Sequence, residues 1–248
     1  MRDILMLTLP GCLRDYRVMG KPLSFENKVV AVTGASGTMG RALMAELLSQ
    51  GAKLIALTTS PQANFPTEIR VLPWQSGQEA ELQSLFRDVD ILIINHGINV
   101  HGERTAAAIT KSLEINSLSV LALMDAFLAV HENSTGKEIW VNTSEAEVGP
   151  ALSPLYEISK RLIGDLITLK RQDAPWTIRK IILGPFKSNL NPVGVMSAER
   201  VAKGVIARAK RDRRNIIVTI NPLTFLAFPL KETAQSFYFR LFSRSPQS

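Results

Sequence analysis

The chain of 248 residues contains one cysteine, Cys12, and three histidines. A single cysteine cannot form an internal disulfide, which fits a reducing compartment such as the cytoplasm. With so few cysteines and histidines we expect no zinc site or other metal centre. The sequence also lacks any run of 18 or more consecutive apolar residues, so it predicts no membrane-spanning helix.

The chain does contain enough apolar sequence to bury a full core. Hydrophobic residues make up 46% of it and charged residues 21%, which argues against global disorder. The net charge of +7 suits phosphate, anionic lipid or nucleic acid as partners. No aromatic residues interleave with the basic run at 208–214, so we expect no nucleic-acid binding.

Apolar, β-branched runs alternate with helical patterns from residue 28 onwards. We expect strands at 28–33, 53–58, 69–72, 89–95, 138–142, 177–183 and 216–220, and helices at 39–50, 78–87, 104–130, 155–170 and 198–210. This alternation predicts an α/β fold, a doubly wound parallel sheet with helices on both faces. We expect a single domain over 28–222, after an irregular leader at 1–27 and before an apolar and basic tail at 223–248.

Tyr156 and Lys160 lie four residues apart in the helix expected at 155–170. At this spacing both side chains share one helix face and can act on one ligand. A free tyrosine titrates near pH ~10, and a nearby lysine ammonium favours the phenolate, which eases proton exchange at neutral pH. The spacing alone is common, so its meaning depends on the motifs that precede it.

A glycine-rich turn from Thr33 to Gly40 joins the first expected strand to the first expected helix. Small residues there let backbone N–H groups approach a pyrophosphate at the positive end of the helix. The position between a strand and a helix indicates a dinucleotide site. An ordinary tight turn without a ligand remains the alternative.

These motifs resemble the short-chain dehydrogenase/reductase family over about residues 28–220. The family's turn, Thr-Gly-x-x-x-Gly-x-Gly, is matched by Thr33, Gly34 and Gly40, while Thr38 replaces the middle glycine and Gly37 lies one step earlier. The resemblance implies a Rossmann-like, NAD(P)-binding catalytic domain. It also implies an enzyme that interconverts a carbonyl and an alcohol by hydride transfer.

Further segments match the family in the expected order along the chain. Asn95 and Gly97 follow the fourth expected strand, and Gly184 to Ser188 follow the sixth, where the family binds the nicotinamide carboxamide. The residues that the resemblance and the turn assign to the cofactor are Gly34, Ser36, Gly37, Thr38, Met39, Gly40, Thr58, Thr59, Asn95, Gly97, Lys160, Gly184, Pro185 and Ser188.

The resemblance also assigns four catalytic positions. Tyr156 would exchange the proton, Lys160 would lower its pKa and bind the nicotinamide ribose, and Asn116 would hold a water in a proton relay. The family's serine lies thirteen positions before its tyrosine; here Ser144 lies twelve before Tyr156 and Thr143 thirteen. Either hydroxyl remains a candidate to bind the substrate oxygen, and we favour Ser144.

The second expected strand ends in Thr58 and Thr59, without a carboxylate. An acid there would bind the ribose 2′-hydroxyl of NAD and repel a 2′-phosphate, so the hydroxyls favour NADP(H), with NAD(H) as the alternative. Arg41 and Lys53 are candidate counter-charges for the phosphate. We expect Glu145 and Glu147, which follow Ser144, to be exposed loop carboxylates, with contact to a polar substrate as the alternative.

The sequence leaves the substrate and the partners open. A short segment after the strand at 177–183 and the apolar tail favour a small, lipophilic carbonyl or alcohol substrate. The tail combines aromatic residues with Arg240 and Arg244, which is typical of contact with a membrane surface, of a homo-oligomer interface or of a lid. Two other functions remain: a nicotinamide-binding sensor or scaffold without turnover, and an isomerase or dehydratase of the same family.

Overall fold

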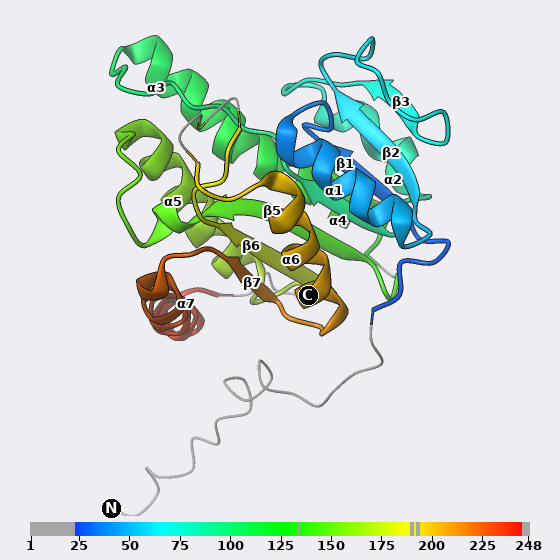
Figure 1. Ribbon diagram of the computed structural model, residues 1–248. Coiled ribbons are helices and arrows are strands. Elements are labelled where there is room, and N and C mark those ends of the chain that lie inside the picture. The colour runs from blue at the N-terminus through cyan, green and yellow to red at the C-terminus, as the bar shows by residue number, and fades with distance from the viewer. Residues whose placement is uncertain (1–22, 133, 189–190, 192–193, 245–248) are drawn as a thin grey trace, which may run out of the picture.

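The computed structural model describes residues 23–132, 134–188, 191 and 194–244. Within them, one seven-stranded parallel sheet has the order β3-β2-β1-β4-β5-β6-β7 (Figure 1). The strands are β1 (Val29–Thr33), β2 (Lys53–Thr58), β3 (Arg70–Pro73), β4 (Ile91–Ile94), β5 (Glu138–Ser144), β6 (Thr177–Leu183) and β7 (Asn215–Val218). The strand order reverses between β1 and β4, so the predicted doubly wound, Rossmann-like fold is confirmed.

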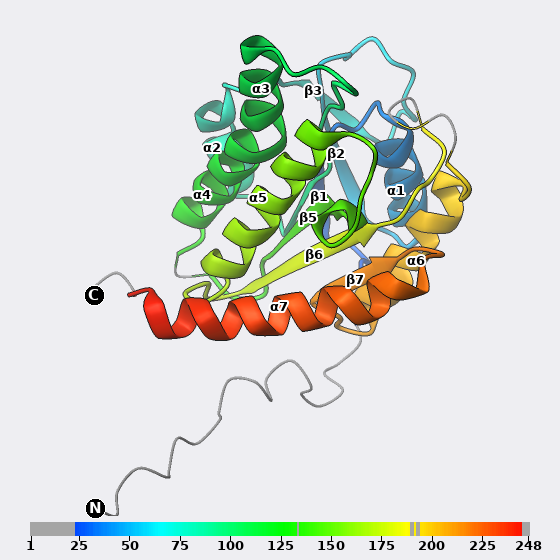
Figure 2. The same ribbon diagram turned by 90° about the vertical axis from the view of Figure 1, so that its left-hand side faces the viewer.

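Helices cover both faces of this sheet (Figures 1 and 2). On one face, α1 (Thr38–Ser49) and α6 (Ala198–Lys210) pack together over β1 and β6. On the other lie η2 (Glu79–Leu82), α2 (Gln83–Phe86), α3 (Ala106–Leu113), η3 (Glu114–Leu118), α4 (Ser119–Val130) and α5 (Pro154–Lys170). The central strands are therefore buried on both faces, and all four residues of β4 are buried and apolar.

The helix expected at 104–130 is interrupted by η3, which is a single π-helical turn. It contains Asn116, which is fully buried and bonded to neighbouring segments. The tract Ala106–Val130 is long and apolar enough to cross a membrane by length and composition alone. However, Leu123, Met124 and Phe127 are fully buried against the sheet, which is the placement of a core helix.

The two ends of the described chain pack on this body. Of the expected leader, residues 1–22 lie outside the described residues, but Phe25 is buried and its ring lies edge-on to Trp140 at 5.8 Å. Of the expected tail, residues 245–248 also lie outside the described residues, and most of the rest forms one long helix, α7 (Pro222–Phe242), which packs against α5 (Figure 2). A short 3-10 turn, η4 (Glu145–Glu147), lies between β5 and α7 and contacts both.

Candidate active site

The parallel strands bring several of the predicted residues to one edge of the sheet. Ser144 ends β5 and pairs in register with Leu183, the last residue of β6. Asn95 and Gly184 follow the carboxyl ends of β4 and β6. In a doubly wound sheet this edge, beside the point where the strand order reverses, is where ligands bind.

Tyr156 and Lys160, both on α5, lie beside Ser144. Burial raises the pKa of Tyr156, and the neighbouring Ser144 hydroxyl partly opposes the rise. Lys160 Nζ lies 5.6 Å from the centroid of the Tyr156 ring and donates to the Asn142 carbonyl at 3.1 Å. Burial lowers the pKa of Lys160 to about 8, against the opposing charge of Glu147, so Lys160 is still largely cationic at neutral pH.

The two candidate hydroxyls of β5 have different partners. Thr143 Oγ1 donates to the Ile181 carbonyl at 3.3 Å, within the sheet. Ser144 Oγ accepts from the Ala146 N–H at 3.2 Å and is the hydroxyl near enough to Tyr156 to influence its pKa. The geometry therefore favours Ser144 over Thr143 as the hydroxyl beside the tyrosine.

Asn116 connects the helices behind the site to the segment after β4. Its Nδ2 donates to the Ile98 carbonyl at 3.0 Å and to Ser159 Oγ at 3.1 Å, and its Oδ1 accepts from the Ile98 N–H at 2.8 Å. A Cβ added to Gly97 would lie only 3.0 Å from that Oδ1. The amide of Asn116 is thus engaged within the protein, so a role in a water relay would fall to its backbone.

The segment after β4 is held to the first strand by polar contacts. Asn142 Nδ2 donates to Asn95 Oδ1 at 2.7 Å, and the Asn95 N–H donates to Thr33 Oγ1 at 2.9 Å. Thr33 Oγ1 also lies 2.9 Å from His96 Nδ1. Burial and the charge of Lys160 lower the pKa of His96 to about 3, so this imidazole is neutral and helps to fix the edge.

The glycine turn leaves the start of α1 open to an anion. Gly37 is the N-cap residue of α1 and provides no side-chain bond, so no cap competes for the N–H groups of the first turn. Gly34 has a φ of +62°, and a Cβ there would approach the His96 backbone within 2.9 Å. The turn therefore has the close-packed backbone and the exposed positive helix end that a pyrophosphate requires. Met39, in contrast, turns its side chain into the core, which leaves only its backbone for a ligand.

Polar groups gather where β2 ends. Thr58 Oγ1 donates to Ser36 Oγ at 2.8 Å, and Thr59 follows as an exposed residue. Arg41 Nε donates to the Ser36 carbonyl at 3.1 Å, and its guanidinium lies 4.9 Å from the centroid of the Phe65 ring. Arg41 is therefore placed as a counter-charge at this end of β2.

Lys53 does not share that position, and its prediction as a counter-charge was wrong. It is the first residue of β2, five residues before Thr58, which is about 17 Å along an extended strand. A strand places residues at its two ends on opposite edges of the sheet, so Lys53 lies away from the glycine turn.

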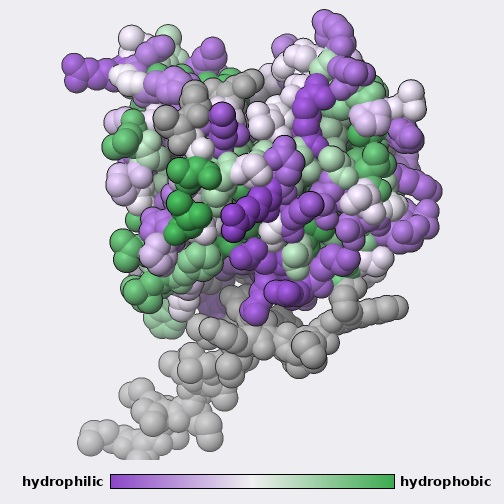
Figure 3. Space-filling view, viewed as in Figure 1, coloured by the Kyte–Doolittle hydropathy of each residue, from purple (hydrophilic) through white to green (hydrophobic). Residues whose placement is uncertain are grey.

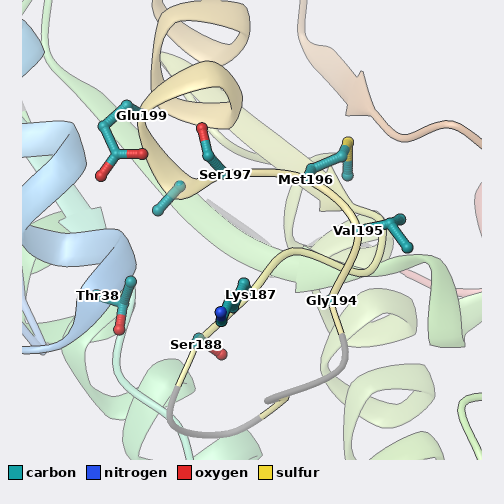
Figure 4. A pocket seen from close by; sticks show the side chains of 9 residues that line it. Thr38, Lys187, Ser188, Gly194, Val195, Met196, Ser197 and Glu199 are labelled. Carbon is teal, nitrogen blue, oxygen red and sulfur yellow. The ribbon is translucent and has the colours of Figure 1, made fainter.

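A pocket of about 770 Å³ opens beside the glycine turn. In Figure 4, Thr38 of α1 faces Lys187 and Ser188 across it, with the start of α6 beyond. Its described lining residues are Thr38, Lys187, Ser188, Gly194, Val195, Met196, Ser197, Ala198 and Glu199. Gly184 and Pro185 lead into this segment, and the Pro185 carbonyl accepts from the Val195 N–H at 3.0 Å. The pocket joins the predicted pyrophosphate turn to the predicted carboxamide turn, so it fits a cofactor rather than the substrate beside Tyr156.

The expectation that Glu145 and Glu147 are exposed loop carboxylates was wrong. Glu147 is buried and pairs with Lys231 Nζ at 3.3 Å and with Lys180 Nζ at 3.7 Å. Glu145 is partly buried and accepts from the hydroxyl of Thr219 at 2.7 Å. The charged and hydroxyl partners of both carboxylates lie more than 30 positions away in the sequence, which a local pattern does not reveal.

Comparisons with known proteins agree with this fold. The family model described as short chain dehydrogenase matches residues 28–192. The chain is 54% identical over 237 residues to the monoglucosyldiacylglycerol epimerase of Synechocystis, across 92% of this chain and 58% of that protein. It therefore spans little more than half the length of this relative. It is also 28% identical over 209 residues to the 3-oxoacyl-(acyl-carrier-protein) reductase FabG of Salmonella typhimurium, across 77% of this chain and 85% of that protein.

Solved structures share the fold at low sequence identity. A short chain dehydrogenase from Burkholderia cenocepacia, in complex with NADP, has a TM-score of 0.73 and 19% identity, and the match covers 90% of this chain and all of that one. One from Leptospira borgpetersenii, with bound NAD+, has a TM-score of 0.68 and 21% identity, covering 80% and 92%. The family match spans most of the chain and includes the glycine turn, Ser144 and the Tyr156–Lys160 pair. The chain is therefore an enzyme of the short-chain dehydrogenase family, as its sequence predicted.

Proposed function

We propose that this enzyme inverts one carbon of a sugar carried by a glycerolipid, through oxidation to a ketone and reduction back to an alcohol. The observation that carries the chemistry is the placement of Tyr156 next to Ser144, at the end of β5, with Lys160 Nζ 5.6 Å from the centroid of the Tyr156 ring. The substrate class is supported by the 54% identity, over 92% of this chain, to an enzyme named for monoglucosyldiacylglycerol. This makes the isomerase alternative, and not one-way reduction, the leading hypothesis.

The residues would divide the work as follows. Tyr156 accepts the hydroxyl proton of the sugar carbon during oxidation and returns it during reduction. Lys160 stabilises the phenolate electrostatically, which counteracts the rise that burial produces in the pKa of Tyr156. Ser144 binds the same substrate oxygen where negative charge develops. Asn116 holds the segment after β4 in place behind these groups.

The residues present fit a nicotinamide dinucleotide, and we favour NADP(H) over NAD(H). The uncapped first turn of α1 would hold the pyrophosphate, and Arg41 with Ser36 and Thr58 would meet a 2′-phosphate. Asn95, Gly97, Lys160 and the turn of Gly184, Pro185 and Ser188 would line the nicotinamide side. When bound, the cofactor would take a hydride from the sugar carbon and return it to the opposite face, with no net oxidation.

This proposal is tested by measuring whether product forms without net consumption of the cofactor. The enzyme would be incubated with NADP+ and detergent-dispersed monoglucosyldiacylglycerol, and the sugars analysed by NMR while absorbance at the reduced-nicotinamide band is followed. We expect an epimer of glucose to accumulate without a matching change in NADPH. Absence of an epimer, with the enzyme folded and cofactor bound, would contradict the proposal.

A second function, one-way reduction of a lipophilic carbonyl, is favoured by the 28% identity to 3-oxoacyl-(acyl-carrier-protein) reductases. The same site would serve it, because Tyr156 can donate a proton to any nascent alkoxide. It predicts stoichiometric consumption of NADPH with a carbonyl substrate, which the same absorbance assay distinguishes from epimerisation. We further expect the enzyme to be a homo-oligomer and to act at a membrane surface. Light scattering measures the oligomeric state.

A further inference from the structure

The C-terminal helix α7 is oriented with its polar side inward. Thr224 and Glu232 are buried, together with the single large apolar residue Phe228. The helix exposes eight large apolar and aromatic residues: Leu223, Phe225, Leu226, Leu230, Phe237, Tyr238, Leu241 and Phe242. Helical spacing places five of them on the side away from the buried residues: Leu223, Leu226, Leu230, Phe237 and Leu241. Leu226 and Phe242 are each 73% exposed. A surface helix normally buries its apolar side, so this helix presents an interaction surface.

Buried ionic contacts fix α7 in this orientation. Glu232 Oε2 accepts from Lys180 Nζ at 2.6 Å and from Thr168 Oγ1 at 3.0 Å, and Glu232 Oε1 accepts from Arg171 Nη1 at 2.9 Å. Lys180 belongs to β6 and is fully buried. Rotating α7 to bury its apolar side would withdraw Glu232, the carboxylate nearest to Lys180, and leave the buried Lys180 charge with Glu147, at 3.7 Å, as its remaining acidic partner. The apolar face, defined by Leu223, Leu226, Leu230, Phe237 and Leu241, is therefore held outward by the core.

The charged residues of α7 indicate which kind of partner fits this face. Glu232 is the only acidic residue of the helix, and it is buried and paired. Arg240 and, just past the helix, Arg244 are exposed at its C-terminal end. Lys231 lies on the flank and pairs with Asp165 at 2.9 Å. An apolar and aromatic face that carries exposed cations and no exposed carboxylate matches the interface of an anionic bilayer.

The N-terminal half of α7 also reaches the active site. Thr224 Oγ1 donates to Glu145 Oε2 at 3.2 Å, and Glu145 directly follows Ser144. Figure 2 shows α7 running along the sheet from the carboxyl end of β7 and passing beneath α5. Figure 3 shows apolar side chains, in green, along the left side of the molecule, where Figure 1 draws α5 and α7. A surface on which α7 lies would therefore be close to the catalytic edge.

We propose that the apolar face of α7 lies on the surface of an anionic membrane and holds the catalytic edge next to it. The choice of a membrane over another apolar partner rests partly on the proposed function, because a diacylglycerol-linked substrate resides in the bilayer. Docking would replace diffusion of an insoluble lipid through water with lateral diffusion to a site already at the interface.

Vesicle sedimentation tests the docking itself. The full chain would be mixed with phosphatidylcholine vesicles with and without 30 mol% phosphatidylglycerol. We expect binding to the anionic vesicles, weakened by high salt, and at least tenfold weaker partition for the Leu226→Gln/Leu230→Gln variant. The matched control, Ile109→Gln/Leu169→Gln, changes exposed apolar residues of α3 and α5 and should alter partition less than twofold. Circular dichroism confirms that both variants fold.

Several outcomes would overturn the proposal. The first is that the wild type does not bind anionic vesicles, and the second is that the α7 variant binds them as well as the wild type does. The third is that light scattering finds an oligomer for the wild type and a monomer for the α7 variant, which would identify a second copy of the chain as the occupant. Turnover separates this proposal from the proposed function. We expect the α7 variant to epimerise detergent-dispersed lipid at the wild-type rate and vesicle-embedded lipid at least tenfold more slowly. A wild type that binds vesicles but never epimerises would refute only the function.

Discussion

Two buried lysines, Lys160 and Lys180, lie in this protein in contrasting surroundings. Lys160 is 5% exposed, and its Nζ donates to one backbone carbonyl, that of Asn142. Lys180 is fully buried, and its Nζ donates to Thr168 and Glu232, with the Glu147 carboxylate 3.7 Å away. Burial lowers the pKa of both lysines, but only Lys180 has carboxylates in direct contact to oppose it.

The difference shows how one fold uses a buried cation in two ways. Lys160 keeps a charge that is poorly compensated and so remains available to a phenolate or a ligand. Lys180 has its charge neutralised by groups on η4 and α7, so it holds the C-terminal helix to the sheet. Glu147 lies between the two, since it pairs with Lys180 and raises the pKa of Lys160.

The largest expected effect is on turnover, which should depend on Lys160 and not on Lys180. Lys160→Met should lower turnover by about 10²–10⁴-fold, the usual contribution of positioned acid–base groups, because Tyr156 loses the charge that favours its phenolate. Its free energy of unfolding should not fall, since a weakly compensated buried charge is removed. Steady-state kinetics and urea unfolding measure both. A marked loss of stability with little loss of turnover would reverse the assigned roles.

Lys180→Met should show the opposite pattern. Removing Lys180 takes a cationic partner from two buried carboxylates: Glu232 keeps Arg171 and Glu147 keeps Lys231. The free energy of unfolding should therefore fall by up to about 3–5 kcal/mol, the cost of breaking a buried ion pair. The double variant Lys180→Met/Glu232→Leu should recover a large part of this loss, because no single unpaired charge is left at that contact. If the single variant unfolds at the same urea concentration as wild type, the anchoring role of Lys180 is wrong.

The pH dependence of cofactor affinity tests the environment of Lys160. Its pKa in the folded protein is about 8, below its ordinary value of 10.5, so its positive charge is lost as the pH rises through about 8. We expect the dissociation constant for NADPH, followed by its fluorescence, to increase above that pH. Between pH 8 and 10.5 Lys160 binds more protons in the unfolded chain than in the folded protein. The contribution of Lys160 to the free energy of unfolding therefore becomes more favourable as the pH rises. A constant affinity up to pH 10 would contradict this.

The smallest expected effect concerns Glu147. Because its carboxylate raises the pKa of Lys160, Glu147→Gln should move the loss of NADPH affinity to lower pH. Glu145→Gln is the matched control, since Glu145 is also on η4 but bonds to Thr219 and Thr224. We expect the control to leave the midpoint in place. Equal midpoints for wild type and Glu147→Gln would show that the two sites are electrostatically independent.

Sequence patterns predicted the elements and strand ends well because these depend on neighbours along the chain. The strands at 53–58 and 177–183 and the helix at 198–210 were predicted with the observed bounds. Parallel pairing then places the ends of β4, β5 and β6 at one edge, so the grouping of Asn95, Ser144 and Gly184 follows from the fold class. Spacing alone left Thr143 and Ser144 open. Their surroundings distinguish them, since Thr143 bonds within the sheet and Ser144 influences the pKa of Tyr156.

The sequence did not reveal α7 as a helix or the burial of Glu147. Pro229 interrupts the helical pattern, and the exposed apolar residues of α7 do not mark the side that packs on the sheet. Burial of Glu147 depends on Lys180, Lys231 and Gly164, where a Cβ would collide with its carboxylate. Such contacts join positions far apart in the sequence, so they become visible only when the helices are assembled on the sheet.

The turnover of Tyr156→Phe tests the central claim most directly, because this change removes only the phenolic oxygen that meets Ser144. Turnover of the detergent-dispersed glycolipid would be measured beside the dissociation constant for NADPH. The proposed mechanism predicts a loss of about 10²–10⁴-fold in turnover with cofactor affinity within about twofold of wild type. Wild-type turnover in this variant would contradict the role of Tyr156 and, with it, the proposed mechanism.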